Sequence, residues 1–180
     1  MREEIENDPI EFDGPIATYT VRELKVSERE LLDRILDRFT PGWQDNMAPG
    51  ASGSLSFVAD SSTFVFGAFQ GEMVVGYASG YRLRLPNGKK SLLMYDLEVA
   101  DDHRRQGLGI LLLQSVLNLG KREGCAEMWL VTEADNEPAI GLYSAAGGRV
   151  ASGSAGDIVF EWTFESSRWT PRRQSSQNQG

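Results

Sequence analysis

Hydrophobic and polar residues follow two different periods along the chain, and these predict strands and helices in turn. Residues 16–24 alternate at period two, as a half-buried strand does. Ser27 and Glu30 then have the spacing of a capping box, which predicts the start of a helix. An apolar stripe at helical spacing follows, and Pro41-Gly42 ends the helix. The stripe consists of Leu31, Leu32, Ile35, Leu36 and Phe39.

Two strongly β-prone runs come later and predict an antiparallel hairpin. Residues 63–69 and 73–85 are rich in aromatic and β-branched side chains, and the tight turn 70–72 joins them. A second turn at 86–89 leads into the apolar residues 92–99, which we expect to form the next strand.

The stretch 92–124 combines a buried strand, a polar turn and an amphipathic helix. Asp96 and Glu98 interrupt the strand at period two, so a strand presents both carboxylates to one face. The helix is predicted over 107–123, and Gly124 is placed to cap its C-terminal end.

The rest of the folded chain is also predicted to consist of strands and a helix. Residues 126–131 predict a strand, and Asn136-Glu137-Pro138 opens a short helix that Gly147-Gly148 closes. Residues 149–151 and 158–164 then predict two closing strands. The order β-α-β-β-β-α-β-α-β-β indicates an α/β protein with a mixed sheet and helices packed on it.

Three segments are expected to lie outside this regular structure. Residues 1–15 form an acidic extension in which proline and glycine discourage regular structure, and 166–180 form a disordered tail, so that 16–165 is one domain. Segment 43–62 predicts a loop with room for one helical turn. It is either a substrate lid or a mobile surface loop.

Composition and charge narrow the function. Lys plus Arg is 18 and Asp plus Glu is 26, giving a net charge of −8. This charge disfavours nonspecific nucleic-acid binding and favours cationic small molecules, unless it serves solubility alone. With one cysteine and one histidine, neither an internal disulfide nor a His/Cys zinc site is expected. We find no membrane-spanning run or signal peptide, so we predict a cytoplasmic protein without a membrane partner.

The turn between residues 101 and 109 has the chemistry of an anion site. A helix N-terminus offers free N–H groups and partial positive charge, to which Arg104 and Arg105 add their own. Gly107 and Gly109 lack the Cβ atoms that would hold a phosphate away. The alternative is a tight strand-to-helix connection with solvated arginines.

Three motifs in order resemble the GNAT superfamily of acetyl-CoA-dependent N-acetyltransferases. Arg104-Arg105-Gln106-Gly107-Leu108-Gly109 is similar to its Arg/Gln-x-x-Gly-x-Gly/Ala signature, and Leu97-Glu98-Val99 resembles the strand before it. Asn136 and Tyr143 resemble the Asn-x-x-Ala-x-x-x-Tyr element. The resemblance covers roughly residues 16–165. It implies a GNAT-like mixed, mostly antiparallel sheet with splayed central strands flanked by helices.

The resemblance also implies an acetyl-CoA site. Backbone groups of Leu97 and Val99 would pair with the pantetheine arm, and the Tyr143 hydroxyl would donate a proton to the leaving thiolate. Asn136 would contact the cofactor, although a plain helix cap is an alternative role, and the Tyr143 ring also suits core packing. The implied cofactor-binding residues are Leu97, Val99, Arg104, Arg105, Gln106, Gly107, Leu108, Gly109, Ile110, Asn136 and Tyr143.

A narrower resemblance suggests the substrate. Residues 94–99 and 103–107 are similar to the Tyr-Asp-Leu-x-Val and His-Arg-Arg-Gln-Gly runs of aminoglycoside 3-N-acetyltransferases. The chain departs from them after residue 131, where it has a shorter acidic segment, and it shows little likeness in 43–62. We predict acetylation of a cationic amine, most simply an aminoglycoside at the 3-N position. The alternatives are a polyamine, another metabolite amine or a protein terminus, or a non-catalytic acyl-CoA sensor.

Acetyl transfer requires a base, because a protonated amine has no free lone pair. Asp96 is the candidate base since it directly precedes Leu97, and Glu98 is the second candidate; the alternative is that both acids face solvent or pair with a nearby base. With Asp135, they would also bind the substrate. No acetyl-enzyme or metal is expected, since Cys125 has the features of a core residue. A homodimer is left open.

Overall fold

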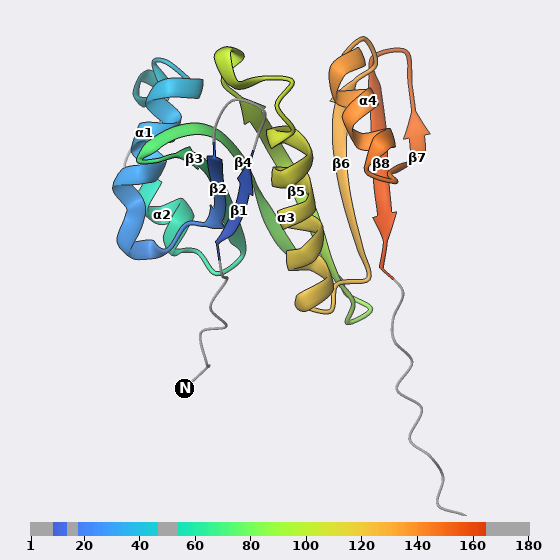
Figure 1. The fold of residues 1–180 in the computed structure, drawn as a ribbon. Coiled ribbons are helices and arrows are strands. Elements are labelled where there is room, and N and C mark those ends of the chain that lie inside the picture. Colours follow the sequence, from blue (N-terminus) through green and yellow to red (C-terminus); the bar gives the residue numbers. More distant parts are fainter. Residues whose placement is uncertain (1–8, 14–17, 47–53, 165–180) are drawn as a thin grey trace, which may run out of the picture.

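The strands form one sheet in a computed structural model that describes residues 9–13, 18–46 and 54–164. The order of its eight strands is β1-β2-β3-β4-β5-β6-β8-β7 (Figure 1). Their bounds are β1 Ile10–Asp13, β2 Thr18–Glu23, β3 Thr63–Gln70, β4 Met73–Arg84, β5 Lys90–Val99, β6 Glu127–Glu133, β7 Arg149–Gly153 and β8 Asp157–Thr163. The helices are α1 Arg29–Phe39, α2 Ser54–Ala59, α3 Leu108–Arg122 and α4 Glu137–Ala145. Three short 3-10 helices complete the elements: η1 Val26–Glu28, η2 Trp43–Asn46 and η3 Asp101–His103.

The centre of the sheet is splayed. Every neighbouring pair of strands is antiparallel except β5 and β6, which pair in parallel over three residue pairs, from Ser91 with Glu127 to Leu93 with Trp129. Strand β5 continues to Val99 without β6 beside it (Figure 1). The predicted mostly antiparallel sheet with splayed central strands is confirmed.

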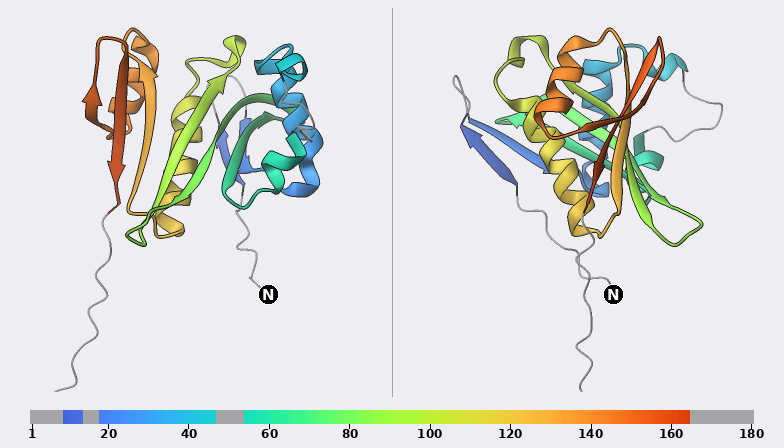
Figure 2. Two further views of the ribbon diagram at one scale, coloured as in Figure 1. Left: turned by 180° about the vertical axis from the view of Figure 1, so that it is seen from behind. Right: turned by 90° about the vertical axis from the view of Figure 1, so that its right-hand side faces the viewer.

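Helices cover both faces of the sheet, which explains the continuous hydrophobicity of β3. Helices α3 and α4 lie on one face, while α1 and α2 lie on the other (Figure 2). Phe64 and Phe66 of β3 pack into the core under α3, and Val65 between them packs into the core under α1. A strand buried on both faces keeps few polar positions.

A β-bulge interrupts β5 near its middle. Ser79 of β4 pairs with Asp96, while the next residue, Gly80, pairs with Met94. Tyr95 is therefore the extra residue, and its side chain is 71% exposed. A bulge of this kind shifts the alternation of side chains by one position.

Because of this shift, the side chains at the end of β5 alternate between the two faces of the sheet in a new register. Met94 lies in the core under α3, and beyond the bulge Leu97 and Val99 pack against the same core. Asp96 and Glu98 therefore lie on the opposite face, the one that α1 covers. The prediction that the two acids share a face is confirmed.

Two local predictions near the N-terminus are wrong. Residues 10–13 form β1, which pairs with β2, although we expected no regular structure there. The breakers Pro9 and Gly14-Pro15 flank these four residues instead of interrupting them, and an edge strand tolerates proline at its ends. The capping box is also displaced: a carboxylate oxygen of Glu28 accepts from the Lys25 N–H at 3.0 Å, and α1 begins at Arg29.

Segment 43–62 contains more helix than expected. It holds η2 and α2, with residues 47–53 between them outside the described part of the chain. Trp43 Nε1 donates to Asp37 at 2.9 Å, which fastens η2 to the end of α1. The predicted tail 166–180 and residues 1–8 also lie outside the described part.

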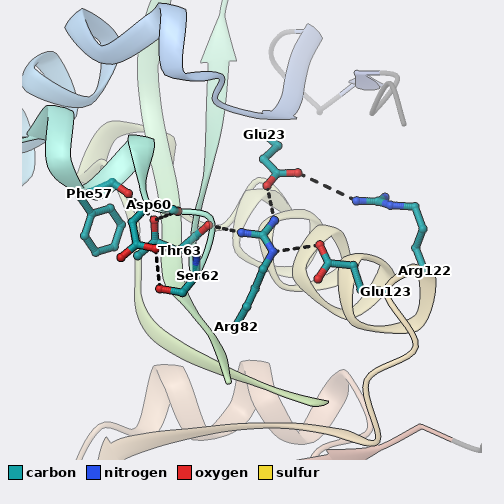
Figure 3. Close-up of polar contacts among 8 residues, drawn as sticks. All are labelled: Glu23, Phe57, Asp60, Ser62, Thr63, Arg82, Arg122 and Glu123. Atoms are coloured by element: carbon teal, nitrogen blue, oxygen red, sulfur yellow. Dashed lines mark hydrogen bonds and ion pairs between the residues drawn. The ribbon is translucent and has the colours of Figure 1, made fainter. Parts of the chain in front are cut away.

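A cluster of polar contacts centred on Arg82 joins β2, β3 and β4 to the end of α3 (Figure 3). Arg82 of β4 contacts Glu23 of β2 at 2.7 Å and Glu123, which follows α3, at 2.9 Å. It also donates to the carbonyl of Thr63 in β3, and Arg122 lies 4.0 Å from Glu23. Because the Arg82 side chain is only 23% exposed, one cation holds together β2, β3 and the end of α3.

Candidate active site

The end of β5 presents backbone hydrogen-bonding groups along the splay. The Ala100 N–H donates to Val75 of β4 at 2.9 Å. Backbone groups point alternately to the two sides of a strand, so those of Leu97 and Val99 point away from β4. The Val99 carbonyl accepts from Arg104 Nε at 3.0 Å, consistent with this direction. The open edge of β5 can therefore pair with an extended ligand.

The turn after β5 contains two residues in left-handed backbone conformation. Arg105 has a φ of 62° and Gly107, the N-cap of α3, has a φ of 89°. Positive φ is uncommon for a residue other than glycine and costs energy that functional sites often carry. Left-handed residues in such turns gather N–H groups into an anion-binding concavity, and no side chain caps the N-terminus of α3. The geometry fits a phosphate site.

The residues of the signature have different roles in this turn. The side chains of Arg104 and Arg105 are exposed, and Arg104 forms an ion pair with Asp101 at 2.9 Å. The Gln106 side chain is buried inside the protein, so it can offer a ligand only its backbone. A Cβ atom added at Gly109 would lie 3.2 Å from Leu142 of α4, so this glycine allows the close approach of two helices.

Helix α4 brings the second predicted motif to the splay. The Asn136 side-chain oxygen accepts from the Ala139 N–H at 3.3 Å, so the helix cap that we considered is present. Tyr143 is buried, and its ring meets those of Phe160 and Trp162 edge-on. Core packing of the Tyr143 ring is therefore present, and the role of its hydroxyl as a proton donor stays a prediction.

The Tyr143 hydroxyl is held in its protonated form. Burial, and then the negative charge of Asp96, raise the pKa of Tyr143 to about 12. The hydroxyl keeps its proton at neutral pH, as it would at the ordinary pKa of 10.0, and the raised pKa makes it a weaker acid than an ordinary tyrosine. Because the charge of Asp96 acts on this hydroxyl, Tyr143 of α4 lies within electrostatic range of Asp96 on β5.

Asp96 and Glu98, here called the acid pair, interact electrostatically with each other, and Tyr77 interacts with both. The Tyr77 hydroxyl donates to a carboxylate oxygen of Asp96. Burial, followed by this hydrogen bond, raises the pKa of Tyr77 well above its ordinary range. Burial, and then the charge of Asp96, raise the pKa of the Glu98 carboxyl. Tyr77 was missed from the sequence, because only the register of β4 against β5 places it beside these acids.

Two groups of aromatic side chains lie on the strands that carry Tyr77 and the acid pair. Phe39, the last residue of α1, packs on Tyr77 with ring centroids 5.3 Å apart. Tyr81 of β4 meets Phe57 of α2 and the exposed Tyr95 edge-on, at 5.7 and 6.1 Å. Acids beside aromatic rings can attract a cation by charge and by cation–π contact.

Three other candidates lie apart from this pair. Asp135 is exposed on the β6–α4 connection, and within the described ranges no contact joins it to Asp96 or Glu98. Cys125 is buried in the core, and burial raises the pKa of its thiol, which disfavours the nucleophilic thiolate. His103 is buried behind the signature turn.

A sequence profile decides the family. The profile of the acetyltransferase (GNAT) family matches residues 28–147, which contain β5, the signature turn and α4. The chain belongs to the GNAT family. The resemblance predicted from the three motifs is thereby confirmed, and with it the class of enzyme, an N-acetyltransferase.

Several named acetyltransferases are similar to this chain. A streptothricin acetyltransferase from Streptomyces lavendulae is 30% identical over 142 residues, which cover 76% of this chain and 72% of that protein. An aminoglycoside acetyltransferase from an uncultured soil metagenomic sample has 25% identity and a TM-score of 0.65, over 76% of this chain and 95% of the other. NAA60 of Arabidopsis thaliana in complex with acetyl-CoA has a TM-score of 0.64 over 81% and 99% of the chains; at 16% identity this shows the fold alone.

Two features are absent among the described residues. No helix there is both long and apolar enough to cross a membrane. No three His, Cys, Asp or Glu side chains of the described ranges gather as a metal-binding group would require. The expected absence of a metal stays a prediction.

Proposed function

We propose that this GNAT enzyme transfers the acetyl group of acetyl-CoA to an amino group of a cationic small molecule, and that the substrate is an aminoglycoside acetylated at its 3-N position. The observation that carries the proposal is the acid pair Asp96–Glu98, with Tyr77 bonded to Asp96 and Phe39 packed on Tyr77, on the strand whose open edge can pair with a cofactor. The names of the streptothricin and aminoglycoside acetyltransferases support a multiply charged amine. We also propose a cytoplasmic location, which the enzyme's cosubstrate favours.

The residues present fit acetyl-CoA. The open edge of β5 at Leu97 and Val99 offers donors and acceptors to the amides of a pantetheine arm. The left-handed turn and the first N–H groups of α3 suit a pyrophosphate, with the guanidinium groups of Arg104 and Arg105 beside them. When bound, acetyl-CoA supplies an activated thioester carbonyl.

The acid pair and Tyr143 can accept and donate the protons that the reaction moves. A carboxylate accepts the first proton of the substrate ammonium ion, directly or through water, and frees the lone pair of the amine. The amine nitrogen then forms a bond to the carbonyl carbon as the carbon–sulfur bond breaks, and the second nitrogen proton passes through water to replace the one given to the sulfur. The Tyr143 hydroxyl, protonated at neutral pH, donates to the departing sulfur.

The two acids have different surroundings, which suggests a division of roles. Tyr77 already occupies one oxygen of Asp96, the base that we favoured from the sequence. The raised pKa of Glu98 brings that carboxylate closer to the proton affinity that a base needs near neutral pH. We therefore assign Glu98 as proton acceptor and Asp96 as the group that orients the ammonium ion, with Asp135 as a more distant attraction for a second positive charge.

The pH dependence of activity tests this assignment. Protonated Glu98 cannot act as a base, so kcat/KM falls as the pH drops through its pKa, which lies above the ordinary value of 4.5. Asp96→Asn removes one cause of that raised pKa, so the acid limb of the kcat/KM profile moves to lower pH. A limb that stays in place in Asp96→Asn would show that another group titrates.

A double variant tests the phosphate assignment. Arg104→Ala with Arg105→Gly removes both charges, while glycine keeps the positive φ without strain. We expect the Kd of acetyl-CoA, measured by calorimetry, to rise about tenfold or more, since hydrogen bonds to charged groups are the stronger ones. An unchanged Kd would contradict a pyrophosphate at this turn.

Release of the CoA thiol with a panel of amines tests the function itself. Aminoglycosides, polyamines and short peptides are compared at equal concentration. Turnover of aminoglycosides alone supports the proposal, and product analysis by NMR then identifies the acetylated nitrogen. Preference for another amine would change the substrate class. Binding of acetyl-CoA without turnover of any amine would instead favour a sensor.

A further inference from the structure

Three buried polar side chains lie directly behind the signature turn. Tyr19 of β2 is 1% exposed, and its hydroxyl donates to Gln106 Oε1 at 2.5 Å. The same hydroxyl lies 3.2 Å from Nδ1 of His103, and the two rings meet edge-on with centroids 5.9 Å apart. The acetyl transfer chemistry uses none of these three side chains.

The hydrogen bonds have a consistent direction. Because the Tyr19 proton points at Gln106, the Tyr19 oxygen can accept from His103 only if that ring carries its proton on Nδ1. Gln106 Nε2 in turn donates to the carbonyl of Asp102 at 3.4 Å. The cluster therefore contacts the turn at Asp102, His103 and Gln106.

Gln106 occupies a special place in the backbone. It stands between Arg105 and Gly107, the two residues with positive φ. A strained turn persists only when its surroundings hold it in place. The Tyr19 side chain comes from a strand 84 residues earlier in the chain, so it can fix the turn from inside the fold.

We propose that Tyr19 is a positioning residue for cofactor binding: through Gln106 and His103 it holds the N–H groups of the signature turn in the arrangement that a pyrophosphate requires. This inference rests on the proposed use of acetyl-CoA. A buried, fully paired network of this kind rigidifies the backbone around it. Preorganisation of the turn lowers the cost of ordering it when the anion binds.

Tyr19→Phe tests the proposal, since it keeps the ring and removes only the hydroxyl. We expect KM for acetyl-CoA, and the Kd measured by calorimetry, to rise roughly tenfold, because Gln106 loses its buried donor. We expect kcat at saturating acetyl-CoA and KM for the amine to stay within about twofold, since the reacting groups are elsewhere. Gln106→Leu should give the same split.

S-acetylpantetheine provides the sharper comparison because it lacks the pyrophosphate. The wild-type preference for acetyl-CoA over this thioester should shrink in Tyr19→Phe, with kcat/KM for S-acetylpantetheine unchanged. A general loss of structure would lower both. Ser115→Ala serves as the control variant, since it removes a buried hydroxyl that bonds within α3 at 2.9 Å, away from the turn.

The outcomes separate this inference from the proposed function. A wild-type protein that binds no acetyl-CoA contradicts the proposed function on which the inference depends. Tight wild-type binding that Tyr19→Phe leaves unchanged overturns the positioning role, even where the melting temperature falls. A non-additive effect of Tyr19→Phe and Gln106→Leu on Kd supports it, because both then act through one network.

Discussion

Glu98→Gln is expected to lower kcat by about 10²- to 10⁴-fold, the range that general base catalysis contributes. Glutamine keeps the size of the side chain and its place on β5 but cannot accept the proton of the amine. The Kd of acetyl-CoA should change little, because β5 is proposed to meet the cofactor through backbone groups of Leu97 and Val99 and not through the Glu98 side chain. Steady-state kinetics with the best amine of the panel, together with calorimetry, measure both quantities.

Two further variants complete this experiment. Glu161→Gln, on β8, makes the same chemical change at an ion pair with Arg149 and should leave kcat unaltered. Asp96→Asn should mainly raise KM for the amine if Asp96 orients the ammonium ion. The reverse pattern, a collapse of kcat in Asp96→Asn with an active Glu98→Gln enzyme, would return the role of base to Asp96.

Arg82→Met is expected to give the largest loss of stability, about 2–4 kcal/mol in the free energy of unfolding. The substitution keeps an unbranched side chain of similar length but leaves Glu23 and Glu123 without their shared cation. We take less than the full cost of breaking a buried ion pair, because these carboxylates are 20% and 28% exposed and water screens them in part. For a chain of this size the melting temperature should fall by roughly 5–15 °C.

An exposed arginine supplies the comparison for this experiment. Arg149 lies 3.6 Å from Glu161, with side-chain exposures of 69% and 38%. Arg149→Met should cost no more than about 1 kcal/mol, as exposed ion pairs do. Adding Glu123→Gln to Arg82→Met should recover part of the lost stability, because it removes the carboxylate that has lost its cation. Equal losses for the two arginines in urea denaturation would contradict a special role of Arg82.

Local patterns predicted most of the fold. Period-two and helical spacings located β3, β4, β5 and α3 to within a few residues, because each element buries a face that the sequence marks with apolar side chains. The order of motifs, with the helix that Asn136 caps, gave the GNAT family. Strand β1 was missed because it has only four residues and is fixed by pairing with β2, which lies outside its own sequence pattern.

The details of the site depend on contacts that are distant in sequence. Tyr77 reaches Asp96 only through the register of two strands, and the bulge at Tyr95 changes that register by one residue. The sequence predicts that Gly109 makes room for a phosphate, and the structure adds that a Cβ atom there would also meet Leu142. Residue spacing along one segment contains no information on such partners.

On strand β5, the groups proposed to meet the cofactor and those proposed to meet the amine respond differently to substitution. The proposed cofactor contacts use backbone groups of Leu97 and Val99, which every amino acid possesses. The side chains of Asp96 and Glu98 face the other way, so substitutions on that face affect amine binding and proton transfer without disturbing cofactor pairing. Deleting Tyr95 would remove the bulge, and Asp96 would then follow Met94 in regular alternation, so both acids would stay on the face that α1 covers. Changes of amine specificity on this strand should therefore arise through substitutions that leave the backbone pairing intact.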